Sequence, residues 1–296
     1  MLTEQRNPRS TAIDRASTLE ILQIMNAEDA TVADAVREAL PAVARAVDAI
    51  TGRLRQGGRL IYVGAGTSGR LGVMDAAECV PTFGTPPTLV QALIAGGEKA
   101  LTQAVEGAED DREAGRRELL ALGVNERDAV VGIAASGRTP YVIAALEAAN
   151  EVGAATIALT CNRPAPLLDV AQIGIAVLVG PEIITGSTRL KAGTAQKMVL
   201  NMLSTATMIR LGKVYGNLMV DVMVTNEKLA DRARRIVSEV VGCTLEEAGK
   251  LLEQTGYAAK PAIVVGLLGV TPDKAQAMLD EAEGRLGDVL AAHLSA

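Results

Sequence analysis

The stretch RLIYVGAGTSGRLGVMDAAECV at residues 59–80 decides the fold. It opens with the apolar run 60–63, which is typical of a buried parallel strand. Glycines interrupt the run at Gly64, Gly66 and Gly69, and apolar residues return at helical spacing from Leu71 onward. The stretch therefore predicts a strand, a glycine-rich turn and a helix. Such a turn directs backbone N–H groups and the positive end of a helix at one point, which suits a phosphate.

The kind of phosphate follows from the residues around this turn. The three glycines match the dinucleotide pattern G-x-G-x-x-G, but that site also needs an acidic residue about twenty positions further on. Residues 84–97 contain no Asp or Glu, whereas the turn itself carries the hydroxyls of Thr67 and Ser68. These features favour a phosphate monoester such as a sugar phosphate. A turn that only packs the helix against the sheet remains the alternative for this loop alone.

A second loop of the same kind strengthens the phosphate interpretation. Residues 128–133 resemble another buried strand, and residues 141–152 resemble another helix. Ser136 and Thr139 lie in the loop between them. Loops at the carboxyl ends of parallel strands can converge on one ligand. The four hydroxyls of the two loops are therefore expected to share one sugar phosphate.

Composition excludes several classes of function. The net charge is −6 and aromatic residues make up 2% of the chain, so a nucleic-acid-binding surface is not expected. The single histidine, His293, is too isolated for a histidine triad or a usual zinc site. Three cysteines far apart in the sequence indicate reduced thiols in a cytoplasmic protein. The polar first residues predict no signal peptide, and no apolar run approaches the length that spans a bilayer.

The remaining segments complete an α/β pattern. Further short β-type runs occur at 88–94, 154–160 and 173–179, and helical segments separate them. We therefore expect a doubly wound parallel sheet of about five strands flanked by helices. Residues 1–50 form an N-terminal arm and helices, 51–225 the sugar-phosphate-binding domain, and 226–296 a helical C-terminal region with a small module. The polar residues 1–15 predict a disordered tail.

Three long motifs resemble one enzyme family. TEQRNPRS at 3–10, VGAGTSGRLGVMDAAECVPTF at 63–83 and GPEIITGSTRLKAGTAQK at 180–197 are similar to signatures of N-acetylmuramic acid 6-phosphate etherases. The region 50–215 resembles a sugar isomerase (SIS) domain, and the resemblance extends from Thr3 to the end of the chain. It implies β-elimination of D-lactate from C3 of N-acetylmuramic acid 6-phosphate, followed by water addition. The other product is N-acetylglucosamine 6-phosphate, formed in cell-wall sugar recycling without a metal or redox cofactor.

The resemblance also implies two catalytic carboxylates. The proton on C2 is acidic because it lies next to the C1 aldehyde of the opened sugar, so a base must remove it and an acid must protonate the leaving oxygen. Glu78 matches the family's proposed general acid, and its apolar neighbours predict partial burial. Glu109 matches the second glutamate and is assigned as the base at C2. The sequence leaves open an exchange of these two roles.

Substrate contacts are expected in three segments. The residues that we predict to bind the phosphate or complete the pocket are Gly66, Thr67, Ser68, Ser136, Gly137, Thr139, Ser187, Thr188 and Lys191. Arg6 and Asn7 in the N-terminal motif are expected to cover an active site, which the SIS resemblance places near the interface of a homodimer. No nucleic acid or membrane partner is expected.

Two other functions fit the same loops. A sugar-phosphate isomerase needs the phosphate site and the removal of the C2 proton but no leaving group. A non-enzymatic sugar-phosphate-sensing regulator, like the glucokinase regulatory proteins, needs only binding; those proteins resemble two SIS domains in a chain of about twice this length. A DNA-binding regulator would need a basic segment before the SIS domain, and residues 17–55 are not basic. The long motifs favour the etherase.

Overall fold

The computed structural model describes residues 1–294 and divides the chain into two compact units. The first unit comprises residues 1–76 and 88–204, and the second comprises residues 77–87 together with the chain from residue 205 onward. Two long helices, α3 (Gly66–Phe83) and α7 (Lys191–Arg210), each begin in the first unit and end in the second. The domain limits expected from the sequence, at 50 and 225, stay a prediction.

A parallel five-stranded sheet forms the centre of the first unit, as the sequence predicts. Its strands are β1 (Leu60–Gly64), β2 (Val90–Ile94), β3 (Ala129–Ile133), β4 (Ala155–Thr160) and β5 (Ile173–Ala176), in the order β2-β1-β3-β4-β5. The chain leaves β1 in one direction, to β2, and returns on the other side, to β3. This reversal is the point at which doubly wound sheets bind their ligands.

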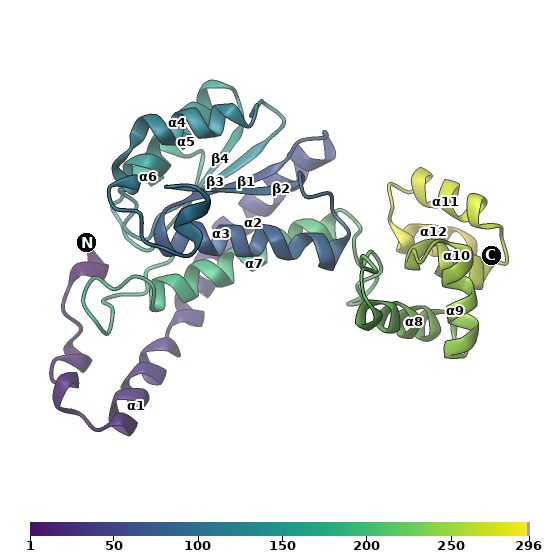
Figure 1. Cartoon of the computed structure of the whole chain (residues 1–296), viewed down its shortest axis with the longest axis horizontal. Helices are drawn as coiled ribbons and strands as arrows, with labels where there is room; N and C mark the ends of the chain where they lie inside the picture. The colour runs from purple at the N-terminus through teal and green to yellow at the C-terminus, as the bar shows by residue number, and fades with distance from the viewer. Residues whose placement is uncertain (295–296) are drawn as a thin grey trace. The chain divides into compact units, whose positions relative to one another are not determined.

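Helices cover both faces of this sheet (Figure 1). On one face lie α4 (Arg112–Ala121), α5 (Pro140–Glu151) and α6 (Pro166–Val170); on the other lie α2 (Val32–Arg55), α3 and α7. The core is mainly aliphatic, because strands buried on both faces are rich in Val, Ile, Leu and Ala, and Tyr62 and Tyr141 are its largest fully buried side chains. Gly132 has no side chain to oppose Val142 and Leu146 of α5, which lets that helix approach β3 closely.

The N-terminal arm is ordered, and the expectation of a disordered tail was wrong. Residues 1–15 form three short turns, Leu2–Glu4, Pro8–Ser10 and Ile13–Arg15, before α1 (Thr18–Asp29). Thr3 is fully buried and exchanges hydrogen bonds with the Asn162 side chain, which follows β4. The Ser10 hydroxyl donates to the carbonyl of Ile183 at 2.7 Å. Buried polar anchors of this kind compensate the entropy that is lost when a polar segment is ordered.

Five helices lie wholly within the described residues of the second unit: α8 (Glu227–Val241), α9 (Leu245–Gln254), α10 (Ala259–Leu268), α11 (Pro272–Glu281) and α12 (Leu286–Leu294). Thr244 and Glu247 form a capping box at the start of α9, a pairing that their spacing of three residues predicts. The sequence analysis did not anticipate α12, which begins after a turn with positive φ at Gly284.

Within residues 1–294, no single helix is long and apolar enough to cross a membrane. The bent pair of α10 and α11, which meet at 109°, passes the same test by length and composition only. The central residues of α10, including Ala262, Ile263 and Val264, are fully buried in the unit's own core.

Candidate active site

The first phosphate loop is built by backbone contact between glycines. A side chain at Gly64 would lie 2.6 Å from the amide nitrogen of Gly69, and one at Gly69 would lie 2.8 Å from the carbonyl oxygen of Gly64. Only glycine permits this approach, which sets the start of α3 directly on the end of β1. Gly66 has φ +52 and open space around its missing side chain. The first turn of α3 therefore presents helix N-terminal amides, which lack intrahelical acceptors, at the sheet edge.

The two hydroxyl residues of this loop lie against the start of α7. Ser68 is buried, and its Oγ donates a hydrogen bond to Oε1 of Gln196 at 3.0 Å. Thr67 is half-buried, and its methyl carbon would lie 3.5 Å from a side chain at Gly193. The segment before and within the first turns of α7 thus forms one wall beside the glycine loop.

The second loop starts at the same edge of the sheet, because Gly64 and Ile133 are paired in register at the ends of β1 and β3. Gly137 has φ +66, and a side chain there would collide with Ala165 and Thr160. The Ser136 hydroxyl accepts from the Arg138 amide at 3.2 Å. Ser136 and Thr139 are both half-buried. The switch point of the sheet therefore brings together the two predicted hydroxyl loops.

The third predicted segment, residues 186–191, contacts the N-terminal arm. The Gly186 amide donates to the carbonyl of Thr3 at 3.1 Å. Ser187 and Thr188 are half-buried and follow directly. The arm thus approaches the loops at the carboxyl edge of the sheet. Asn7, expected to cover a site, is buried at 5% exposure, whereas Arg6 is exposed.

Lys191 has a partner that the sequence analysis did not anticipate. Its buried ammonium lies 2.6 Å from the Glu28 carboxylate of α1, which also accepts from Asn7 and pairs with Arg9. Burial favours the neutral form of Glu28, but the hydrogen bonds from Lys191 and Asn7 and the charges of Lys191 and Arg9 outweigh it, so the pKa of Glu28 lies below its usual value. The ion pair joins the arm, α1 and the start of α7.

The N-terminus of α7 is occupied by a buried carboxylate. Glu182 is fully buried and accepts hydrogen bonds from the amides of Lys191 and Ala192 at 3.0 and 2.9 Å. Burial raises the pKa of Glu182, although these two hydrogen bonds act in the opposite direction. Burial and the nearby Glu182 also raise the pKa of the Cys161 thiol to about 12. This arrangement holds the start of α7 in place beside the glycine loop.

The two predicted catalytic glutamates lie on different segments. Glu78 lies on α3 and is exposed, so the partial burial expected from its apolar neighbours was wrong. Cys79 is buried, but Ala77 and Glu78 are both exposed, so the helical period turns this side of α3 outward. Glu109 lies in the short turn Ala108–Asp110 and is also exposed. Arg70 in the first turn of α3 donates to the carbonyls of Leu101 and Gln103 and so ties the loop that leads to Glu109 to the glycine turn.

A buried carboxylate on α3 was missed by the sequence analysis. Asp75 accepts hydrogen bonds from Tyr62 of β1 at 2.8 Å and from Asn201 and Ser204 of α7 at 2.7 and 3.2 Å. The only signal in the sequence was an acidic residue within an apolar helical face. This cluster fixes α3 against the sheet and α7, which sets the direction in which α3 carries its exposed residues.

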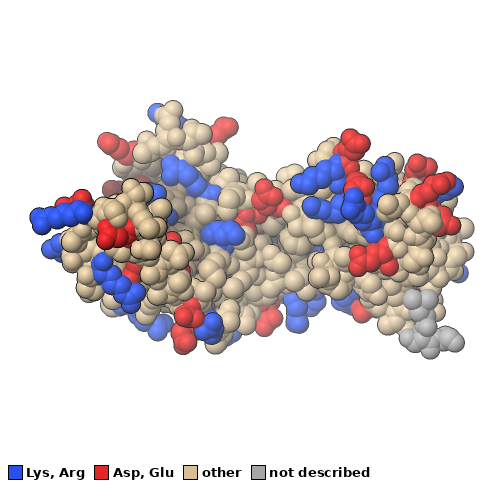
Figure 2. Space-filling view, turned by 90° about the horizontal axis from the view of Figure 1, so that it is seen from below, with Lys and Arg blue, Asp and Glu red and all other residues tan. Residues whose placement is uncertain are grey.

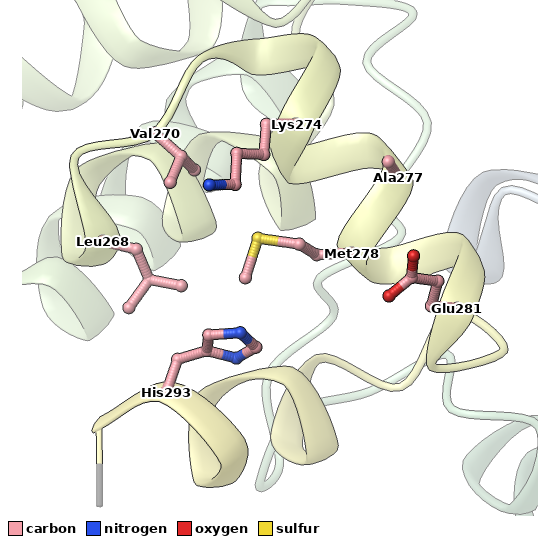
Figure 3. Close-up of a pocket in the computed structure, with 7 residues that line it drawn as sticks. All are labelled: Leu268, Val270, Lys274, Ala277, Met278, Glu281 and His293. Atoms are coloured by element: carbon pink, nitrogen blue, oxygen red, sulfur yellow. The ribbon is translucent and has the colours of Figure 1, made fainter. Parts of the chain in front are cut away.

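A cavity outside the glycine and hydroxyl loops contains none of the residues predicted to bind phosphate. A cavity of about 440 Å³ in the second unit is lined by Leu268, Val270, Lys274, Ala277, Met278, Glu281 and His293 (Figure 3). It has neither a glycine turn nor a hydroxyl pair. Figure 2 shows acidic and basic side chains mixed on the face that it presents. Among the described residues, no group of three or more His, Cys, Asp or Glu side chains is arranged to hold a metal ion.

Two family models and several known proteins are similar to this chain. The model of the glucokinase regulatory protein N-terminal SIS domain matches residues 42–150, and that of the SIS domain matches residues 110–206. The N-acetylmuramic acid 6-phosphate etherase of Pasteurella multocida is 54% identical over 98% of this chain and 96% of its own length. The protein of the same name from Yersinia pestis is 56% identical over 97% of each chain.

Solved structures share the fold at lower identity. A phosphoheptose isomerase from Francisella tularensis has a TM-score of 0.51 at 21% identity, covering 66% of this chain and 100% of its own. A phosphoheptose isomerase from Neisseria gonorrhoeae has a TM-score of 0.50 at 19% identity, covering 64% and 98%. These likenesses show the fold alone.

Proposed function

The chain belongs to the N-acetylmuramic acid 6-phosphate etherase family, and we propose that it cleaves the D-lactyl ether of N-acetylmuramic acid 6-phosphate. The products are N-acetylglucosamine 6-phosphate and D-lactate, and the role is recycling of cell-wall sugar in the cytoplasm. The observation that carries this proposal is 54% identity to an etherase across 98% of the chain and 96% of the etherase's own length.

The phosphate of the substrate binds at the switch point of the sheet. The amides of the first turn of α3 and the hydroxyls of Thr67 and Ser68 supply donors on one side. Ser136, Gly137 and Thr139 supply the other side from the adjacent strand end, and Ser187 and Thr188 complete the pocket. Hydroxyl and amide donors suit a phosphate dianion, which only accepts hydrogen bonds. Lys191 contributes indirectly, because its ammonium is engaged by Glu28.

Two carboxyl groups perform the elimination. Glu109 removes the proton from C2, which the C1 aldehyde of the open-chain sugar makes acidic. Glu78 protonates the oxygen of the departing lactate, and water then adds to C3 of the unsaturated aldehyde. At the start of the cycle Glu109 must be ionised to accept a proton, and Glu78 must be protonated to donate one.

A second copy of the chain completes the site. Glu78 follows Gly66 by twelve positions on one helix, so it lies about 18 Å further along the helix axis at ~1.5 Å per residue. The three carbon–carbon bonds between C6 and C3, the carbon that carries the ether oxygen, span much less, even fully extended. The glutamate side chain cannot close the remaining gap. The homodimer that we propose resolves this mismatch, because Glu78 of one protomer then serves the phosphate loop of its partner.

Release of D-lactate from N-acetylmuramic acid 6-phosphate tests the proposed function. The purified protein should release D-lactate, and Glu78→Gln and Glu109→Gln should each abolish it. Glu113→Gln is the matched control, because it removes an exposed carboxylate from the same acidic stretch as Glu109. Its activity should match wild type. A folded protein that binds sugar phosphates without releasing lactate would overturn the etherase proposal, and interconversion of an aldose and a ketose phosphate would point to an isomerase.

A further inference from the structure

Gln196 on α7 holds an unpaired polar atom beside the phosphate loop. The residue is 1% exposed, and its Oε1 accepts the hydrogen bond from Ser68. Its Nε2 is buried without a hydrogen-bond partner among the described residues. A buried amide donor that forms no hydrogen bond costs stability, so such groups are rare and often have a functional reason.

The hydrogen bond between Ser68 and Gln196 conflicts with phosphate binding. A serine hydroxyl has one proton to donate and two lone pairs that accept. In the observed arrangement the Ser68 proton points to Oε1 of Gln196. A phosphate dianion offers only acceptors, so Ser68 has nothing to donate to it until this proton turns away from Gln196.

We propose that Gln196 is a positioning residue that reverses the direction of the Ser68 hydroxyl when phosphate binds. A half turn of the carboxamide exchanges Nε2 and Oε1. Nε2 then donates to the Ser68 oxygen, and the Ser68 proton is free to bond a phosphate oxygen. This state pairs the buried Nε2 and gives the phosphate a donor. The inference rests on the proposed role of Ser68 in binding the substrate phosphate.

The surroundings of Gln196 favour rotation of its side chain over movement of its helix. Glu182 fixes the first amides of α7. One turn before Gln196, a side chain at Gly193 would lie at ordinary van der Waals distance, 3.5 Å, from the methyl carbon of Thr67. The Glu182 hydrogen bonds therefore hold the start of α7, and the terminal amide of Gln196 is the part that can turn.

A double-mutant cycle between Gln196 and Ser68 tests this inference. The measured quantity is the dissociation constant of N-acetylglucosamine 6-phosphate and of inorganic phosphate, with KM and kcat where turnover is observed. Gln196→Met keeps the side-chain length but removes both polar atoms. Gln196→Glu keeps an acceptor and, when ionised, provides no donor, so it holds the Ser68 proton away from the ligand. We expect Gln196→Glu to weaken binding about tenfold or more, the scale of one charge-assisted hydrogen bond. Gln196→Met should weaken it less, and both should act on KM more than on kcat.

The double-mutant cycle distinguishes a Gln196 that acts through Ser68 from one that does not. In a Ser68→Ala background, Gln196→Met should cause no further loss, because Gln196 acts through the Ser68 hydroxyl. Equal losses in both backgrounds, or wild-type affinity in Gln196→Glu, would overturn the inference. Thr207→Val is the control for burial, because Thr207 lies about three turns further along α7 and also carries a buried, unpaired oxygen. It should leave phosphate affinity unchanged.

Thermal unfolding and ligand binding distinguish loss of the fold, failure of the etherase proposal and failure of the role proposed for Gln196. Thermal unfolding identifies any variant that has lost its fold. Binding of the two phosphate ligands needs no turnover, so failure of D-lactate release would refute the etherase proposal without deciding the role of Gln196.

Discussion

The proposed composite site makes a quantitative prediction about mixed dimers. Glu78→Gln and Glu109→Gln are each expected to be inactive when pure. After the two variants are mixed and allowed to exchange subunits, half of the dimers contain one copy of each. In such a dimer one site has Glu109 from the first variant and Glu78 from the second, and the other site has neither. Random exchange therefore restores about a quarter of wild-type activity in a twofold-symmetric dimer.

The sharing of one site between two protomers is inferred from the length of α3. Glu78 lies about 18 Å along the helix from the glycine loop of its own chain, so one protomer cannot supply both the phosphate loop and this carboxyl to one sugar. The assay is D-lactate release, and native mass spectrometry establishes that mixed dimers have formed. Mixed dimers that remain inactive would refute the reasoning, because they would mean that both glutamates act within one chain.

Four further predictions concern stability and thiol reactivity. Gly69→Ala places a methyl group against the backbone of β1 and should cost about 1–3 kcal/mol of unfolding free energy, measured by denaturant, and should weaken phosphate binding; an unchanged midpoint would contradict the close approach. Lys191→Met breaks the buried pair with Glu28 and should cost about 3–5 kcal/mol at neutral pH. Because the pKa of Glu28 is lowered by folding, its stabilisation is present above its unfolded pKa and is lost as pH falls through the folded pKa, so Glu28→Gln should flatten the acid limb of the stability curve. Alkylation of the native protein should modify Cys243 before Cys161, because Cys161 is fully buried with a pKa of about 12; early modification of Cys161 would contradict its burial.

The elements that could be predicted from the sequence are those set by residues close together in the chain. The apolar run 60–63 and the glycines after it specify a buried strand and a close turn wherever they occur. The sheet and its two loops follow, because strands that alternate with helices form a parallel sheet with loops at one edge. The helix start at Thr244 was predictable for the same reason, since its partner Glu247 lies three residues away.

Interactions between distant segments could not be predicted. Glu28 and Lys191 are 163 positions apart, and nothing near either residue indicates the other. The order of the N-terminal arm also depends on a distant contact, because Thr3 accepts a hydrogen bond from Asn162. The pairing of Ser68 with Gln196, 128 positions apart, joins two motifs that were recognised separately. The exposure of Glu78 depends on which face of α3 packs inward, and apolar neighbours in the sequence did not determine that.

Turnover in water enriched in oxygen-18 and deuterium tests the proposed cleavage most directly. Elimination followed by water addition breaks the bond between C3 and the ether oxygen. The account therefore predicts solvent oxygen at C3 and deuterium at C2 of N-acetylglucosamine 6-phosphate, while D-lactate keeps the original ether oxygen. Solvent oxygen at the hydroxyl of lactate, with no deuterium at C2 of the sugar, would contradict β-elimination and the roles proposed for both glutamates.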